Sequence, residues 1–423
     1  MRSRRVLIDL GPLRRYRQFR RLWTGYLVST LGNQITLVAV PYQVYRITHS
    51  TLDVGLVSLA QLGPLLLGSL GGGTLADRVD RRRLLITTQT LLASTSVALA
   101  VNARLTHPTL WAVFFFSAMA AGLSGIDSPT RSALVADFVG RDELAKASAL
   151  WQLLFSVNVV VGPALAGLLI GHFGISAAYI ADIATFTASL TSVVLLDKTL
   201  KAPRREFSAR ELFDGLRYLR GHQVLQGVFL IDINAMVFGM PRALFPALAV
   251  VRFHGGAETV GLLYAAPGAG ALIGAAFAGW VAAIRHQGRA VLIAVAVWGA
   301  AITVFGVVTA LWAGCIALIV AGGADVISAV FRGAILQFEA PVALRGRLQA
   351  VQTAVVTGGP RLGDLESGAV AAGIGAVDSV IVGGLACLAG VVALMQALPR
   401  FGRYEPDASP RYEATPGELD VEG

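Results

Sequence analysis

Long apolar stretches separated by short polar breaks make up most of this chain of 423 residues. A helix needs about 20 residues to cross the roughly 30 Å hydrocarbon core of a bilayer, and twelve stretches come close to that length. They lie near residues 22–45, 53–76, 84–105, 109–128, 146–170, 175–196, 225–251, 258–283, 290–308, 311–333, 349–372 and 376–398. The pattern predicts an all-α membrane protein with twelve transmembrane helices.

The longest polar break falls between the sixth and seventh stretches. Within it, Ser208 as N-cap and Glu211 three residues later predict an amphipathic helix over residues 208–219 that lies along the membrane surface. The predicted order is therefore a basic N-terminal segment (1–21), a six-helix bundle (22–196), a linker (197–224), a second six-helix bundle (225–398) and a disordered tail (399–423).

The composition favours lipid as the solvent of this chain. Only 14% of its residues are charged and 55% are hydrophobic, whereas soluble proteins carry about 25% charged residues. A net charge of +9 would suggest nucleic acid for a soluble protein, but here the basic residues gather on one side of the predicted membrane. The only exceptions among the 35 are Arg46, Arg104, Arg242, Arg252 and Arg361. This bias predicts a multi-pass protein of the inner or plasma membrane with both termini cytoplasmic, and no nucleic-acid partner.

The sequence shows none of the residue patterns that are typical of enzyme active sites. It has no clustered histidines, no acid pair beside an activated nucleophile, and no phosphate-binding loop. Cys315 and Cys387 both lie in apolar stretches and form neither a disulfide framework nor a metal site. We therefore expect no catalytic residue, cofactor or metal, and an ion gradient rather than ATP as the source of energy.

A run of six charged residues lies within residues 73–83, between the second and third stretches. So many charges cannot lie in hydrocarbon, so they mark a short cytoplasmic turn in which an acid can cap a helix. The pattern G-x-L-A-D-R-x-x-R-R-R resembles the loop between helices 2 and 3 of major facilitator transporters. It departs at Asp80, where that family usually has glycine.

The chain also repeats itself after roughly 200 residues. Residues 54–56 match residues 260–262, and residues 125–127 are echoed by residues 323–325. Two six-helix halves in the same orientation resemble the parallel repeat of major facilitator transporters, in which substrate lies between halves that rock about it. The second copy of the charged turn is eroded, since Ala283 stands where the acid would be.

The resemblance to that superfamily implies a conformational latch on the cytoplasmic side. An ion pair between Asp127, at the inner end of the fourth stretch, and Arg81 would clamp this side when it is closed. Asp77 would meet the N-terminus of the eleventh stretch. The predicted latch residues are Gly73, Asp77, Arg78, Arg81 and Asp127.

By the repeat, Asp325 on the tenth stretch should take the part of Asp127. Its expected partner is Arg285 or Arg289. We therefore expect a structural role for Asp325.

Three acids within the stretches are candidate proton carriers: Asp232 first, then Asp364, then Asp182. An unpaired carboxyl in a water-filled cavity can exchange protons near neutral pH. The alternatives are hydrogen bonds that pack helices, or, for Asp364, an ion pair with Arg361 three residues away on one helix face.

Polar and small residues supply the remaining candidates. Asn33, Gln34, Arg242 and Arg361 are candidate substrate contacts, with Arg332 as a further anion partner and Tyr264, Phe238 and Trp151 as stacking surfaces. The segment with Gly162, Pro163 and Gly167 resembles an element of the fifth helix of proton-coupled exporters, although Asn158 replaces its leading glycine. Ordinary packing by small residues is the alternative.

Several blocks closely resemble the enterobactin exporter subfamily. They are residues 10–19, 40–44, 48–51, 54–56, 246–249, 261–266 with Gly270, and 345–348. The resemblance implies a monomeric secondary exporter that moves a siderophore-like, hydrophobic or aromatic small molecule out of the cytoplasm by proton antiport. A multidrug or macrolide efflux pump of the same fold is the alternative, followed by nutrient uptake and a membrane scaffold without transport.

Overall fold

The computed structural model describes residues 9–197, 217–277, 284–341 and 344–406. All regular structure in these parts of the chain is helical. The helices are α1 (Gly11–Arg15), α2 (Arg17–Thr48), α3 (Thr51–Arg78), α4 (Arg81–Arg104), α5 (Leu110–Phe138), η1 (Arg141–Glu143), α6 (Leu144–Phe173), α7 (Ile175–Val194), α9 (Gln223–Phe238), η2 (Arg242–Leu244), α10 (Phe245–Val251), α11 (Ala257–Phe277), α12 (Gln287–Val307), α13 (Leu311–Glu339), α14 (Arg345–Ile374), α15 (Ala376–Ala397) and α16 (Pro399–Gly402).

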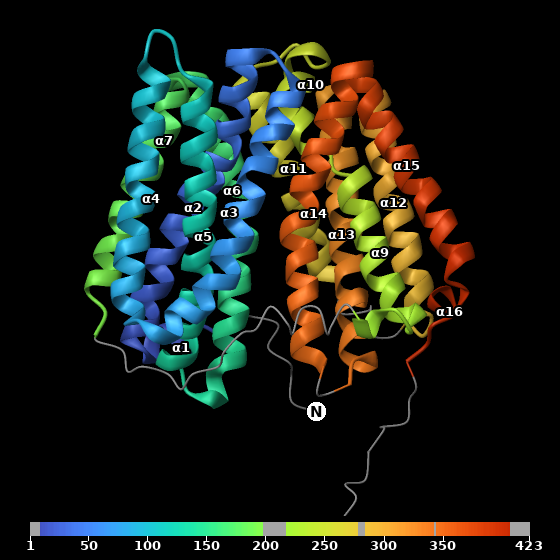
Figure 1. Ribbon diagram of the computed structural model, residues 1–423, viewed down its shortest axis with the longest axis horizontal. Helices are drawn as coiled ribbons and strands as arrows, with labels where there is room; N and C mark the ends of the chain where they lie inside the picture. The colour runs from blue at the N-terminus through green and yellow to red at the C-terminus, as the bar shows by residue number, and fades with distance from the viewer. Residues whose placement is uncertain (1–8, 198–216, 278–283, 342–343, 407–423) are drawn as a thin grey trace, which may run out of the picture.

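Ten helices in the described parts of the chain are long and apolar enough to cross a membrane, with α9, η2 and α10 counted as one span. Two further long helices, α2 with 32 residues and α14 with 30, pack among them but carry more polar residues. Figure 1 shows α2 to α7 gathered on one side and α9, α12, α13, α14 and α15 on the other. We call the group of α2 to α7 the N-half. We call the other group, together with α10, α11 and α16, the C-half.

Local chemistry explains where several helices begin. The Ser50 hydroxyl accepts a hydrogen bond from the Asp53 N–H (3.2 Å) at the start of α3, and an Asp80 carboxylate oxygen accepts one from the Arg83 N–H (3.0 Å) at the start of α4. Asp80, the departure from the family pattern, is therefore a helix cap. Gly174 and Gly375, with φ of 83° and 93°, make the tight turns that lead into α7 and α15.

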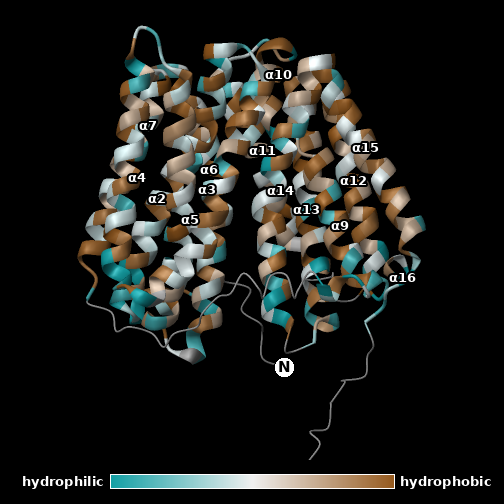
Figure 2. Ribbon diagram, viewed as in Figure 1, coloured by the Kyte–Doolittle hydropathy of each residue, from teal (hydrophilic) through white to brown (hydrophobic). Residues whose placement is uncertain are grey.

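The two ends of the helix bundle differ in charge. Arg17, Arg81 and the first residues of α6 lie at one end, which we call the basic face, and the turn at Ser50 and Gly174 lies at the opposite face. Figure 2 shows hydrophilic residues gathered at the basic-face ends of the helices and apolar residues along most of their length. This distribution matches a bundle whose middle is surrounded by hydrocarbon.

The halves meet toward the opposite face, where α3 packs on α14 and α6 packs on α11. Glycine makes these contacts close: a Cβ on Gly55 would lie 2.7 Å from the Asp364 carbonyl oxygen, and one on Gly261 would lie 2.6 Å from the Pro163 carbonyl oxygen. The Thr51 hydroxyl also donates to the Gly368 carbonyl oxygen (3.1 Å). Toward the basic face the ribbons of the two halves diverge (Figure 1).

Two sequence predictions about element ends are wrong. Helix α5 continues to Phe138, ten residues past the predicted end, so Asp127 lies well inside the helix. The tail predicted to be disordered from residue 399 begins with α16, because Phe401 is fully buried in space that Gly227 and Gly288 leave open. Most of the amphipathic helix expected over residues 208–219 lies outside the described residues.

Candidate functional site

A cavity of about 570 Å³ lies between the two halves. Its wall combines N-half residues from α2 and α6 with C-half residues from η2 and the long helices around it, among them Gln34, Gln152, Phe155, Arg242, Tyr264 and Trp298. A second compartment of about 310 Å³ is lined by N-half residues and by Arg361 of α14, and it shares Gln34, Leu37 and Phe155 with the first. Together they have the size of a pocket for a small organic molecule.

The larger compartment is mostly apolar and aromatic. Phe245 meets the Tyr264 ring edge-to-face with centroids 5.0 Å apart. The Tyr264 hydroxyl donates to the Arg242 carbonyl oxygen (3.0 Å), and the Trp298 indole N–H donates to the Gly239 carbonyl oxygen (2.9 Å). These hydrogen bonds fix both rings, so they offer rigid surfaces to a planar ligand.

Of the three predicted stacking residues, Tyr264 lines this cavity and the other two do not. Phe238 is 40% exposed on the surface of α9. Trp151 instead stacks on Tyr26, with centroids 4.3 Å apart. Tyr26 in turn lines the smaller compartment, so Trp151 supports that wall from behind.

Asp364 lies where the two halves join. Its carboxylate accepts a hydrogen bond from the N-half Ser58 hydroxyl (3.0 Å) and lies 3.5 Å from a guanidinium nitrogen of Arg242 in the C-half. The predicted pair of Asp364 with Arg361 is wrong, because Arg361 turns toward the N-half compartment that it helps to line. Arg361 makes no ion pair with a carboxylate in the described parts of the chain.

Asp127 is the centre of a buried network in the N-half. It accepts hydrogen bonds from Thr88 (3.1 Å) and Gln89 (2.8 Å) on α4, and its other oxygen pairs with Arg131 one helical turn away (2.6 Å). Arg131 also donates to Ser189 (3.1 Å) on α7. The network ties α4, α5 and α7 together and lies at the wall of the smaller compartment.

The predicted pair of Asp127 with Arg81 is therefore replaced by two others. Arg81 is buried and pairs with Asp137 near the basic-face end of α5 (2.6 Å). The physical reason is the length of α5. Asp127 lies ten residues before Asp137, which at 1.5 Å per residue places it about 15 Å farther from the basic face. Gly73 has open space beside it, and Arg78 is exposed at the end of α3. The Asp77 side chain lies outside the described residues.

The C-half has its own buried charge network. Asp232 on α9 is fully buried and forms a close ion pair with Arg332 on α13, while Gln352 on α14 donates to its other oxygen (3.1 Å). Asp325 lines the central cavity and lies 3.9 Å from Arg332. The expected pairing of Asp325 with Arg285 or Arg289 is wrong, because both arginines lie at the start of α12 near the basic face.

Asp182 on α7 is buried without an ion pair among the described residues. Its carboxylate accepts hydrogen bonds from the hydroxyls of Thr36 (2.8 Å), Ser96 (2.6 Å) and Thr185 (3.5 Å). Hydroxyls can donate to a carboxylate or accept from a carboxylic acid, so this setting accommodates both protonation states. Asp232 and Asp364, by contrast, both face an arginine.

The remaining predicted residues lie along α2 and α6. Asn33 lines the smaller compartment, and Gln34 lies between the two compartments. The Gln34 side chain packs directly on Gly162, Pro163 lines the larger compartment, and Gly167 packs on α11. The glycine–proline segment thus positions a cavity residue and joins the halves.

Sequence analysis missed the partners of the buried acids. Arg131 had an available signal, because it lies four residues after Asp127 on one helix. The sequence suggested Arg332 only as a partner for an anionic substrate. Its contact with Asp232 joins residues 100 positions apart, so no sequence spacing could predict it. The hydroxyls around Asp182 likewise come from three different helices.

Solved structures with this architecture are membrane transporters. A POT family transporter in complex with 5-aminolevulinic acid gives a TM-score of 0.71 at 10% identity, with 91% of this chain and 97% of that chain covered. A bacterial homolog of the human lysosomal transporter Spinster, inward-facing and unoccupied, gives 0.68 at 14% identity, with 94% and 100% covered. The fold is therefore that of major facilitator superfamily transporters.

Residues 8–422 match the family described as transmembrane secretion effector, and the chain belongs to that family. The enterobactin exporter EntS of Citrobacter koseri is 28% identical over 410 residues, with 96% of this chain and 98% of the relative covered. That of Salmonella typhimurium is 28% identical over 399 residues, with 94% and 96% covered. The resemblance to this superfamily and subfamily is thus confirmed, and the chain is a multi-pass membrane transporter related to exporters.

Proposed function

We propose that this protein exports a small aromatic or hydrophobic molecule from the cytoplasm by alternating access. One observation carries the proposal: the cavity between the halves draws its wall from both of them, while the halves are packed together toward one face only. A solute held there is released to the other side when the halves rock about it. The relatives named as exporters support outward movement.

The proposed topology has twelve spans and both termini in the cytoplasm. The ten apolar helices together with α2 and α14 supply the twelve. The basic face is then cytoplasmic by the positive-inside rule, and the cavity faces the cytoplasm. We further propose that Gly73, Asp77, Arg78 and Arg81 act at this face as a latch that engages when the halves close there.

The proposed substrate is siderophore-like, planar and anionic. Arg242 and Arg361 bring two guanidinium groups to the cavity walls, and Asp364 lies within ion-pair distance of the first of them. Rigid aromatic rings beside them suit a catecholate. Asn33 and Gln34 add hydrogen-bonding groups. A multidrug pump is the second candidate, because Asp325 also faces the cavity and would attract a lipophilic cation.

We propose that protons drive export and that Asp182 carries them. Its carboxylate is buried among hydroxyls, and no arginine of the described residues pairs with it, which supports exchange between charged and neutral forms. Asp364 is the second choice, because it lies at the junction of the halves. Asp232, which the sequence made the first candidate, becomes the last because Arg332 pairs with it. The protein acts as a monomer in this proposal.

Transport into inverted membrane vesicles tests the function. We expect an imposed inside-acid pH gradient to drive uptake of enterobactin, and Asp182→Asn to abolish that dependence because the amide cannot titrate. Asp378→Asn, at an exposed acid at the start of α15, is the matched control and should behave as wild type. Uptake of a lipophilic cationic dye in place of enterobactin would favour the multidrug alternative. Transport of either compound at a rate that does not depend on the pH gradient would contradict proton coupling.

A further inference from the structure

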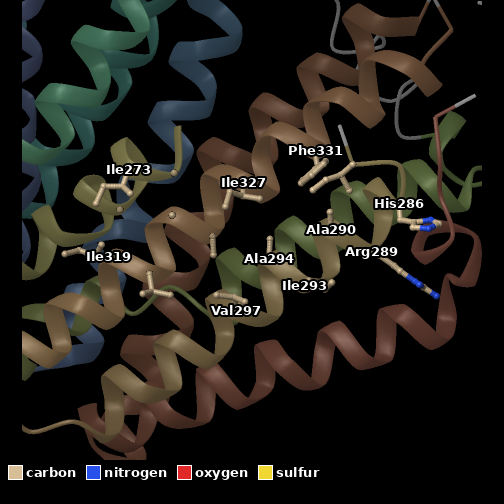
Figure 3. Close-up of a pocket in the computed structure, with 16 residues that line it drawn as sticks. Ile273, His286, Arg289, Ala290, Ile293, Ala294, Val297, Ile319, Ile327 and Phe331 are labelled. Atoms are coloured by element: carbon tan, nitrogen blue, oxygen red, sulfur yellow. The ribbon is translucent and has the colours of Figure 1, made fainter. Parts of the chain in front are cut away.

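Another hollow of the described structure lies away from the central cavity. It is a groove of about 830 Å³ on the outer side of the C-half, between α11, α12 and α13. Figure 3 shows Ile273 and Ile319 at one end of the groove and His286 and Arg289 at the other, with apolar side chains between them. The groove belongs to the surface that faces lipid rather than to the transport site.

Close packing of two helices gives the groove its depth. Helices α11 and α12 both pack on α13. A Cβ on Gly274 of α11 would lie 2.9 Å from the Gly323 carbonyl oxygen of α13, so these two helices touch backbone to backbone. On the side of α12 that lines the groove, Ala290 and Ala294 have short side chains that leave its space open. A slot with apolar walls therefore remains between α11 and α12.

Charge is concentrated at the basic-face end of this slot. Arg285, His286 and Arg289 lie within five residues at the start of α12, and all three are exposed. His286 contacts Glu405 (2.7 Å), but Arg289 has no ion pair or hydrogen bond to any residue that the structure describes. The corresponding turn of the N-half carries Asp77 and Asp80 among its arginines. The C-half turn offers an unbalanced positive charge at headgroup depth.

The length of the groove matches one leaflet of a bilayer. Ile319 and Phe331, which line it along α13, are twelve residues apart, or about 18 Å along the helix axis. Half of the hydrocarbon core is about 15 Å thick. An acyl chain lying in the slot would therefore reach from the headgroup level to the bilayer midplane.

We infer that this groove is a binding site for one anionic phospholipid of the leaflet at the basic face. Its phosphate lies against Arg289, with Arg285 nearby, and an acyl chain lies in the slot beside Ile293 and Val297. A membrane-facing slot with an unpaired guanidinium at headgroup depth attracts an anionic lipid more than a zwitterionic one. The site is independent of the proposed substrate and of proton coupling.

Native mass spectrometry of the full chain in detergent tests the inference by titrating phosphatidylglycerol and phosphatidylcholine separately. We expect one phosphatidylglycerol to bind more tightly than phosphatidylcholine. Arg289→Ala should weaken phosphatidylglycerol binding about fivefold, the effect of one basic residue near an anionic headgroup, and Arg289→Lys should retain it. Ala290→Phe, which fills the slot, should weaken both lipids.

Arg83→Ala is the matched control, because Arg83 is an exposed arginine at the start of α4, at the same face in the N-half. Equal losses for Arg83→Ala and Arg289→Ala, or equal affinity for the two lipids, would overturn the site, as would inorganic phosphate competing as well as lipid. A photoreactive residue at Ile293, which is 63% exposed, provides a second measurement that does not alter Arg289. Capture of lipid supports the proposal, and capture of a peptide from this chain contradicts it.

Discussion

Three buried carboxylates show how single residues are accommodated inside this bundle. Asp127 is held by an arginine one turn away on its own helix, Asp232 by Arg332 of another helix, and Asp182 by hydroxyls alone. A charge in a membrane interior is stable only when it is paired, hydrated or neutralised. From these three settings we expect different roles: the first two carboxylates should stabilise packing, and the third should be able to change its protonation.

The Asp232–Arg332 pair should behave as a coupled unit. Replacing Arg332 leaves Asp232 buried without an ion pair, and replacing Asp232 leaves Arg332 with only the more distant Asp325 (3.9 Å). Breaking a comparable buried pair costs about 3–5 kcal/mol. We expect Arg332→Met and Asp232→Leu each to lower the thermal unfolding temperature in detergent strongly, and the double variant to lie closer to wild type than either single variant. Additive losses in the double variant would show that the two residues contribute independently, contrary to the ion pair in the structure.

At the scale of helices, glycine decides where the halves can meet. Gly55 of α3 lies against the backbone of α14, and Gly167 of α6 lies against that of α11. No larger residue allows two helix axes so close without displacement of one of them. These contacts lie toward the opposite face, so we expect the glycines to be needed for one conformation of the transporter rather than for folding of either half.

Gly55→Val should therefore favour opening of the opposite face. Its side chain would displace α14, whereas Gly63→Val on the same helix meets no atom within 4 Å and serves as a matched control. The reporter is Gln34→Cys in the cavity, in a chain with Cys315 and Cys387 replaced by alanine. We expect a membrane-impermeant maleimide applied to intact cells to label this cysteine with Gly55→Val and not with Gly63→Val. Equal labelling in both backgrounds would contradict a role for Gly55 in closure.

At the scale of the whole molecule, the two halves enclose a cavity that neither could form alone. The larger compartment needs Gln34 and Phe155 from the N-half and Arg242 and Tyr264 from the C-half. The halves pack together toward one face, and their ribbons diverge toward the other (Figure 1). Movement between two such states is the source of transport in this fold.

The proposed twelve-span topology would place both ends of the chain on the same side of the membrane. In the background without native cysteines, Ser409→Cys in the tail should resist an impermeant maleimide applied to spheroplasts and react after the membrane is broken. Thr106→Cys, in the turn between α4 and α5 at the opposite face, should react in both cases. Labelling of Ser409→Cys in intact spheroplasts would imply an odd number of spans or an inverted orientation.

The sequence by itself predicted most of the architecture, because hydrophobic length and the placement of arginine follow directly from the cost of charge in hydrocarbon. It also singled out Asp127, Asp182, Asp232 and Asp364, since an acid within an apolar stretch is visible in one dimension. Where α5 would end was not visible, because its last ten residues mix polar and apolar side chains and include the charged Arg131 and Asp137.

Only the tertiary structure decided the partners of these acids. Arg332 reaches Asp232 across 100 residues and Arg242 reaches Asp364 across 122, and each contact depends on how separate helices pack. The unpaired state of Asp182 and the groove beside Arg289 likewise belong to the arrangement of several helices. Hydrophobicity is a property of each residue and can be summed along the chain, whereas an ion pair or a cavity exists only between residues that folding brings together.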